Sequence, residues 1–270
     1  MIIWLAPNLY SPSMAVDRLV QLTGDFMQGG MVRGMTQVGA KITLYGKSVR
    51  VSDDGKFVFG FGRDATGEAT LEVELPGGET ETRALKISAR EYRVERIDGL
   101  PSKMVTPPPE VLKRIRRENK KIAQVRKLDT PETWYAATFQ WPASGRISGV
   151  YGSQRILNGE ARRPHFGVDV AAPVGTPVYA PAGGNVALAE NDLYYTGGTV
   201  MINHGHGITS LFSHLSAVDA KVGTEVAAGD LIGRIGATGR ATGAHLDWRV
   251  NWFGERLDPE LLVGPMPDGP

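Results

Sequence analysis

Histidine is confined to one part of this 270-residue chain. All of the histidines fall between residues 165 and 245, and none precedes them. Imidazole is the commonest metal ligand in proteins and the usual general base at neutral pH. The clustering therefore predicts a zinc hydrolase site that is built by the C-terminal half of the chain. The histidines are His165, His204, His206, His214 and His245.

Two short motifs combine histidine with aspartate. His165 and Asp169 form a His-x-x-x-Asp pattern. The two side chains share a face if one regular strand carries both, and a turn through Gly167 would also bring them together. Either geometry allows an imidazole and a carboxylate to bind one metal ion. His245 and Asp247 are two positions apart, so on a strand their side chains also share a face.

The composition is that of a globular protein with many turns. The chain is 41% hydrophobic and 22% charged, and its 34 glycines and 17 prolines favour a β-rich fold over a helical bundle. Thirty basic and 29 acidic residues give a net charge of +1, so no nucleic acid partner is expected. The absence of cysteine excludes disulfides and cysteine metal sites. No apolar run approaches the ~20 residues that span a bilayer.

The first half of the chain divides into two segments. Residues 1–25 form an N-terminal segment whose opening is mildly apolar but lacks a basic region and contains Pro7, so a signal remnant and a structured N-terminus both remain open. Residues 26–92 predict a small antiparallel sandwich, because short strands alternate with turns such as Asp54-Gly55. This segment resembles the immunoglobulin-like domains that are appended to bacterial envelope enzymes. The expected strands span residues 38–45, 48–51, 56–61, 69–75 and 81–87.

The second half begins with a change of pattern. Residues 93–134 predict a linker with a basic amphipathic helix over 110–127, which is opened by prolines and packs on a neighbouring domain. Residues 135–263 predict an all-β domain, because glycine separates nearly all the short strands, and residues 264–270 form a tail. The expected fold class is therefore mainly β. The strands expected here span residues 146–151, 168–171, 177–180, 185–190, 199–203, 209–214, 231–235 and 245–252, with a helical turn over 259–262.

Further motifs follow the His-x-x-x-Asp pattern in order. They are Ala171-Ala172-Pro173-x-Gly175-Thr176-Pro177-Val178, Asn203-His204-Gly205-His206-Gly207, Leu211-Phe212-Ser213-His214-Leu215, Gly229-Asp230-x-Ile232-Gly233 and Gly243-Ala244-His245-Leu246. Together, over about residues 139–260, they resemble the lysostaphin-type zinc metallopeptidases, which cleave peptidoglycan cross-bridges. The resemblance implies an antiparallel β-sheet domain of the lysostaphin type, like the duplicated hybrid motif. It does not extend to the first half of the chain.

The resemblance also implies roles for single residues. His165 and Asp169 match the first two zinc ligands, and His214 and His245 match the two catalytic histidines that do not bind the metal. The third ligand of the family is the second histidine of a His-x-His pair, and here Asp247 occupies that position. Because carboxylate oxygen also binds zinc, the expected set for Zn²⁺ is His165, Asp169 and Asp247. Two carboxylates cancel the charge of the ion, which is expected to make it a weaker Lewis acid.

Four further residues are candidates for a substrate groove. His204 and His206 lie in a glycine-rich turn, where a structural role, a contact at the groove rim and metal ligation all remain open. Tyr194 and Tyr195 lie in a loop that either lines the groove or packs against the domain.

The expected function is that of a metal-dependent endopeptidase that hydrolyses peptide cross-links of bacterial peptidoglycan in the cell envelope, as a periplasmic or exported protein. One of His214 and His245 would take or orient the proton of the attacking water, and the other would stabilise the oxyanion. The alternative is an inactive module that binds peptidoglycan or regulates an amidase, and Asp247 is the feature that favours it. The expected partners are peptidoglycan peptide stems and, through the N-terminal domain, another envelope protein.

Overall fold

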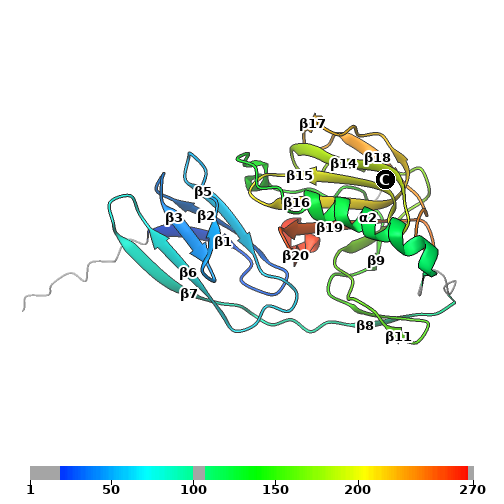
Figure 1. The fold of residues 1–270 in the computed structure, drawn as a ribbon, viewed down its shortest axis with the longest axis horizontal. Coiled ribbons are helices and arrows are strands. Elements are labelled where there is room, and N and C mark those ends of the chain that lie inside the picture. Colours follow the sequence, from blue (N-terminus) through cyan, green and yellow to red (C-terminus); the bar gives the residue numbers. More distant parts are fainter. Residues whose placement is uncertain (1–18, 100–106, 267–270) are drawn as a thin grey trace, which may run out of the picture.

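The structure is a computed structural model that describes residues 19–99 and 107–266. Residues 1–18 of the N-terminal segment considered above as a signal remnant, residues 100–106 of the expected linker and the end of the expected tail at 267–270 lie outside the described residues. Figure 1 shows two β-rich bodies side by side, with the N-terminal body on the left and the C-terminal body on the right. The mainly β fold class is therefore confirmed.

The N-terminal body consists of two small antiparallel sheets that share one apolar core. Its strand β6 shows the pattern that builds such a core, because Ala69, Leu71 and Val73 are buried while the residues between them are exposed. Strands β1 and β2 were not predicted from the sequence. One sheet contains β1 (Val20–Gly24), β2 (Met31–Thr36) and β5 (Lys56–Gly60). The other contains β4 (Lys47–Val49), β3 (Lys41–Leu44), β6 (Glu68–Glu74) and β7 (Thr80–Lys86).

The C-terminal body is built on one large sheet, which contains ten strands in the described part of the chain. Its central order is β17-β14-β15-β16-β19-β12-β9, with β13 and β18 attached beside β16 and β20 attached to β19. Their bounds are β9 (Arg146–Gly149), β12 (Val168–Ala171), β13 (Pro177–Tyr179), β14 (Gly184–Leu193), β15 (Gly197–Asn203), β16 (Ile208–Val218), β17 (Glu225–Val226), β18 (Leu231–Ile235), β19 (His245–Trp252) and β20 (Glu255–Leu257). The short helix η2 (Pro259–Leu262) follows β20. The predicted strands of this domain are confirmed, and β12, β18 and β19 have the predicted bounds.

A helix of the linker covers the outer face of this sheet. Helix α2 (Pro109–Val125) starts with Pro109 in its first turn, where the missing N–H has no helical partner to lose. Ile122 and Val125 pack against Met201 of β15. On the opposite face of β15, Val200 and Ile202 belong to the main core, so this strand is buried on both sides. Within the described ranges no helix has the length and apolar character needed to cross a bilayer.

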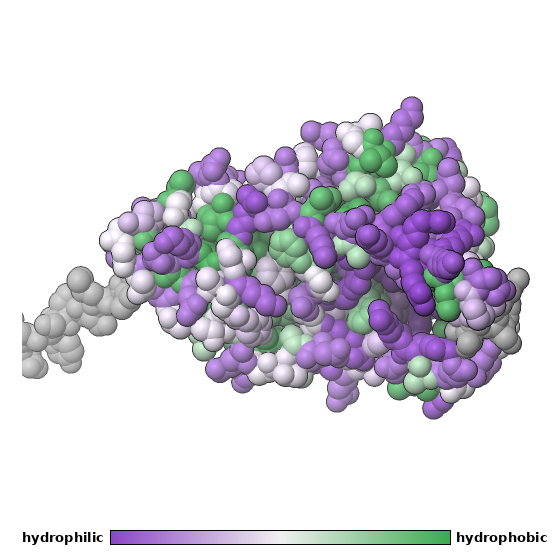
Figure 2. Space-filling model, in the orientation of Figure 1, coloured by the Kyte–Doolittle hydropathy of each residue, from purple (hydrophilic) through white to green (hydrophobic). Residues whose placement is uncertain are grey.

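The other part of the linker forms a strand beside the C-terminal body. Strand β8 (Val94–Ile97) pairs in parallel with β10 (Gln154–Leu157), which pairs with β11 (Glu160–Ala161). The sequence predicted none of these three strands. Figure 1 shows this small sheet below α2, and Figure 2 shows a hydrophilic hollow in the surface between them.

The two bodies are packed closely against each other. Asp258, which is buried, pairs with Arg90 of the N-terminal body at 2.7 Å, and its backbone N–H donates to the Gly29 carbonyl at 2.8 Å. A Cβ atom added to Gly60 of β5 would lie 2.4 Å from Leu257 of β20. The N-terminal body therefore rests on the end of the β19–β20 hairpin.

The turn between β15 and β16 is anchored in the core by a histidine. The His204 ring is fully buried, with its Nδ1 2.6 Å from the Gly183 carbonyl and its Nε2 2.9 Å from the Ser210 hydroxyl. Because a carbonyl only accepts, Nδ1 carries the proton and Nε2 accepts from Ser210. The ring also packs edge-on to Phe139. At Gly205, φ is +86° and a Cβ would lie 1.7 Å from the Glu132 carbonyl of the segment before the short helix η1 (Trp134–Ala136), so only glycine fits there.

We predict that His204 makes the fold less stable in mild acid. Burial lowers the pKa of His204 from 6.5 to about 4, so the unfolded chain takes up a proton first as the pH falls. The free energy of unfolding should therefore fall by about 2 kcal/mol more in the wild type than in His204→Asn between about pH 7.5 and about pH 5. Urea unfolding with a chelator present measures both proteins, and equal losses would contradict the prediction.

Candidate metal centre

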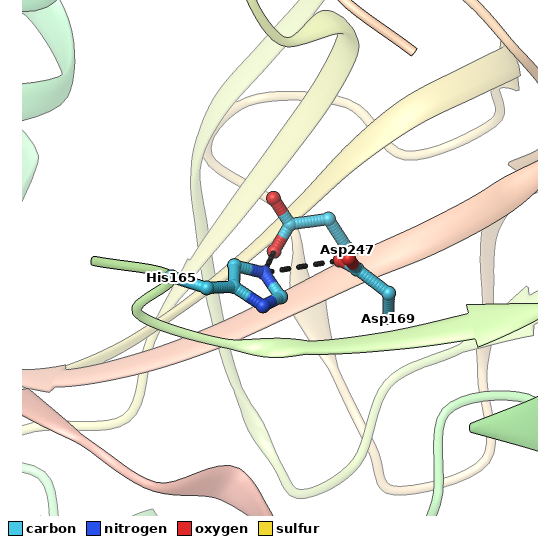
Figure 3. Close-up of side chains that lie close together, drawn as sticks. All are labelled: His165, Asp169 and Asp247. Atoms are coloured by element: carbon cyan, nitrogen blue, oxygen red, sulfur yellow. Dashed lines mark ion pairs between the residues drawn. The ribbon is translucent and has the colours of Figure 1, made fainter. Parts of the chain in front are cut away.

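Three buried side chains converge at one point of the large sheet. One atom from each of His165, Asp169 and Asp247 lies within 4.8 Å of the other two. The His165 Nε2 atom is 3.1 Å from Asp169 Oδ1 and 3.5 Å from Asp247 Oδ1. Figure 3 shows both carboxylates, which come from neighbouring strands, facing the same nitrogen of the imidazole. The structure thus brings together the three residues that were predicted as metal ligands.

The register of the sheet produces this convergence. Asp169 of β12 lies directly opposite Asp247 of β19. Strand β12 begins at Val168, so His165 precedes it and reaches the site through a bend at Gly167. Of the two geometries considered for the His-x-x-x-Asp motif, the bend is the one observed. The backbone of His165 is held by hydrogen bonds of 2.8 Å with Ser153 and Gly152.

The donor atoms fit a bound divalent cation such as zinc. Within the described residues, the buried His165 Nε2 and Asp169 Oδ1 have no partner in hydrogen-bond geometry, although both face the same point. Glycine leaves room around the carboxylates, since a Cβ on Gly149 would lie 2.2 Å from Asp169 Oδ2 and one on Gly167 would lie 2.8 Å from Asp247 Oδ1. One imidazole nitrogen and two carboxylate oxygens are ligands that zinc accepts.

Each carboxylate also forms an ion pair with an arginine. Arg155 of β10 lies 2.7 Å from Asp169 Oδ2, and Arg249 of β19 contacts both oxygens of Asp247. Burial opposes ionisation of Asp247, but Arg249 and His165 outweigh it and hold the pKa of this carboxyl well below its usual range. Burial likewise opposes ionisation of Asp169, and His165 and Arg155 lower its pKa. Both groups are therefore ready to bind a cation as carboxylates.

The two predicted catalytic histidines lie beside this cluster. The rings of His214 and His245 are 4.7 Å apart, and His245 Nε2 is 3.9 Å from Asp169 Oδ1. The Nδ1 atom of His214 is 2.8 Å from the Thr238 carbonyl, and that of His245 is 2.9 Å from the Gly243 carbonyl. Because carbonyls only accept, each neutral ring carries its proton on Nδ1 and leaves Nε2 as an acceptor. Burial lowers the pKa of His214 to about 4.

The backbone at His214 is unusual and is supported from a neighbouring loop. Its φ is +65°, a conformation that residues other than glycine adopt at a cost of about 1–3 kcal/mol and that clusters at functional sites. The His214 N–H donates to the Thr196 carbonyl at 2.7 Å. The loop between β14 and β15, which contains Tyr194 and Tyr195, thus lies next to His214, one of the two predicted catalytic histidines. Arg240 stacks on the Tyr195 ring at 4.5 Å.

His204 and His206 were candidates for lining a substrate groove, but both side chains are buried. His204 is fully buried, and only 2% of His206 is exposed, with its ring against Tyr135. A groove contact requires an accessible side chain, so of the three roles left open for these residues the structural one agrees with the structure. Neither residue belongs to the described group that could hold a metal.

The sequence reasoning missed the two arginines. Arg249 could have been found, because it is two residues after Asp247 on a strand and so lies on the same face. Arg155 belongs to β10, which was not predicted, and a contact over 14 residues through an irregular loop has no local signal.

Comparison with known proteins agrees with this geometry. A model of peptidase family M23 matches residues 163–259. The DD-carboxypeptidase/endopeptidase Mpg of Neisseria meningitidis serogroup B is 38% identical over 123 residues, which are 46% of this chain and 28% of that protein. The peptidoglycan DD-endopeptidase ShyA of Vibrio cholerae is 40% identical over 106 residues, which are 39% of this chain and 24% of that protein. The chain thus spans about a quarter of these relatives.

One solved structure is similar over nearly its whole length. It is a crystal structure from Pseudomonas aeruginosa described as a peptidase M23, with 31% sequence identity and a TM-score of 0.69. The similarity covers 89% of this chain and 96% of that chain, so it includes the N-terminal body as well as the sheet that carries the candidate metal centre. The chain therefore belongs to peptidase family M23.

Proposed function

We propose that this protein is a zinc-dependent endopeptidase that hydrolyses peptide bonds in the peptide stems of peptidoglycan. One observation carries the proposal: His165, Asp169 and Asp247 place three metal-binding atoms within 4.8 Å of one another, beside two histidines with an available Nε2 atom. The substrate class is supported by the relatives, two of which are named as peptidoglycan or DD-endopeptidases. The same relatives support a place in the bacterial cell envelope.

The residues of the chain have distinct tasks in this proposal. When bound to His165, Asp169 and Asp247, zinc would supply Lewis-acid activation of a water molecule and of the scissile carbonyl. The neutral His214 and His245 rings offer Nε2 as the acceptor for the proton of the attacking water. After protonation, the same nitrogen donates a hydrogen bond to the negatively charged oxygen or a proton to the leaving amine. Thr238 and Gly243 hold both rings in the required tautomer.

The inactive alternative loses its main support. It depended on Asp247 in place of a histidine, but the Asp247 carboxylate belongs to the group of three residues that could hold a metal ion, and its surroundings favour the ionised form. Both catalytic histidines are also positioned next to that group. No observation therefore favours a module that only binds peptidoglycan or regulates an amidase.

The remaining parts of the chain are assigned by inference. We propose that residues 26–92, together with β1, form an immunoglobulin-like domain that contacts another envelope protein, and that residues 93–134 are the linker to the peptidase domain at 135–263. The two-sheet core supports the first assignment. Tyr194 and Tyr195 are proposed to line the groove, because their loop holds the His214 backbone through Thr196.

The direct test of the proposed function is digestion of purified sacculi. The zinc-loaded protein should release soluble muropeptides in which peptide cross-links are cleaved. A chelator should stop the release, because the proposed reaction depends on the metal. Added zinc should restore it, because the neutral imidazole and the carboxylates can bind zinc again. Mass spectrometry of the released fragments measures the outcome. Intact sacculi, in a reaction where a known endopeptidase is active, would contradict the proposal.

Removal of the third ligand should abolish metal binding. Asp247→Ala leaves His165 and Asp169 as two ligands, too few for a zinc site in which three protein ligands are usual. Equilibrium dialysis followed by metal analysis should give one zinc per chain for the wild type and none for Asp247→Ala. Asp219→Ala, which changes a half-exposed aspartate outside the site, is the control and should keep its zinc. An unchanged zinc content in Asp247→Ala would show that another group is the ligand.

Substitution of His214 or His245 should reduce activity without reducing metal binding. His214→Gln and His245→Gln keep all three proposed ligands but remove a proton acceptor. Each variant should bind zinc like the wild type and digest sacculi about 10²–10⁴-fold more slowly, the range typical of general acid–base catalysis. Loss of zinc from either variant would place that histidine among the ligands instead, and unchanged rates in both would remove them from the mechanism.

A further inference from the structure

Arg249 makes a two-pronged contact with the proposed third ligand. Its Nε atom lies 2.9 Å from Asp247 Oδ1 and 3.0 Å from Oδ2, and its Nη2 atom also contacts Oδ2. A planar guanidinium matches a carboxylate in this way and fixes the plane of the carboxylate as well as its charge. Asp247 Oδ1 is at the same time the atom that faces His165 Nε2 at 3.5 Å. One oxygen therefore meets both the arginine and the metal position.

The fold provides the space for this pair. Asp247 and Arg249 are two residues apart on β19, so their side chains lie on one face of the sheet. Gly167 lies across from them, and a Cβ there would be 2.6 Å from Arg249 Cγ and 2.8 Å from Asp247 Oδ1. The Asp247 side chain is 2% exposed and that of Arg249 is 25% exposed. The carboxylate is therefore shielded from water and the guanidinium is its cationic partner.

The Asp247–Arg249 pair offsets the extra negative charge that a second carboxylate ligand brings to the metal. Two carboxylates alone would cancel the charge of a divalent cation. Arg249 neutralises Asp247, so the pair contributes no net charge, as a neutral imidazole would. Arg155, which contacts Asp169, is itself 3.5 Å from Glu95, and these two opposite charges also cancel. With Asp169 as the remaining charge, a divalent ion would keep a net charge of +1.

We propose that Arg249 is a positioning residue that allows an aspartate to serve as the third metal ligand. It orients the Asp247 carboxylate toward His165 and cancels the charge of that carboxylate. The inference rests on the proposed metal-dependent function. It also corrects the expectation of a weaker Lewis acid, which considered the ligands without Arg249.

The test is a double-mutant cycle read by zinc affinity. It compares the wild type, Arg249→Met, Asp247→His and the variant with both substitutions, using competition against a coloured zinc chelator. Arg249→Met alone should weaken zinc binding about 10–100-fold, the usual cost of removing a group that orients a ligand. In the Asp247→His background, Arg249 has no carboxylate to hold and its charge repels the cation. There, Arg249→Met should leave zinc binding unchanged or strengthen it.

Arg249→Lys tests the role of the charge, and zinc binding by the wild type tests the proposed function on which the inference rests. Arg249→Lys keeps the charge, so it should retain more zinc affinity than Arg249→Met; equal loss in both would overturn the charge role. If Arg249→Met weakens zinc binding equally in both backgrounds, Arg249 has only a structural role and the proposal is overturned. The proposal is also overturned if Arg249→Met leaves zinc affinity unchanged in the protein that retains Asp247. Failure of the wild type to bind zinc would instead contradict the proposed function. Thermal unfolding of each metal-free variant confirms that it is folded.

Discussion

The antiparallel pairing of β12 with β19 is the constraint on which the site depends. This register sets Asp169 opposite Asp247, and the bend at Gly167 then brings the Nε2 atom of His165 close to both carboxylates. A shift of one residue would turn one of the carboxylates to the other face of the sheet and remove the site. The pairing is fixed from the opposite face of the sheet, because Val168, Val170, Leu246 and Trp248 beside these aspartates are completely buried in the main core.

Placing two carboxylates so close together has an electrostatic cost. Two like charges within 4.8 Å of each other repel by at least about 3 kcal/mol at an effective dielectric constant of about 20. In the described part of the chain, the compensating groups are His165 and the two arginines. In the metal-free protein, a protonated His165 and the two arginines keep Asp169 and Asp247 ionised despite burial. Both carboxylates are therefore available to a divalent cation once His165 is neutral.

The sequence predicted the peptidase domain better than its surroundings. The strands over 168–171, 231–235 and 245–252 were predicted correctly because apolar alternation and glycine mark their ends, and the ligand set followed from motifs in a known order. The β8–β10–β11 sheet was missed, since a two-residue strand and a parallel pairing between distant segments leave no local pattern. For a related reason, the sequence did not distinguish a structural role of His204 from a contact at the groove rim. A glycine-rich turn at the surface and one anchored in the core have the same local sequence, and only the packing of Phe139 and Gly183 around His204 distinguishes them.

The linker is joined to the candidate metal centre through side chains. Glu95 of β8 pairs with Arg155 of β10, and Arg155 pairs with Asp169.

The proposed zinc site has one imidazole and two carboxylates as ligands, with Asp247 in place of a second histidine. X-ray absorption spectroscopy of the zinc-loaded protein can test this ligand set, because it counts imidazole ligands. We expect one histidine nitrogen and otherwise oxygen ligands around zinc. Two or more imidazoles in the shell would contradict it.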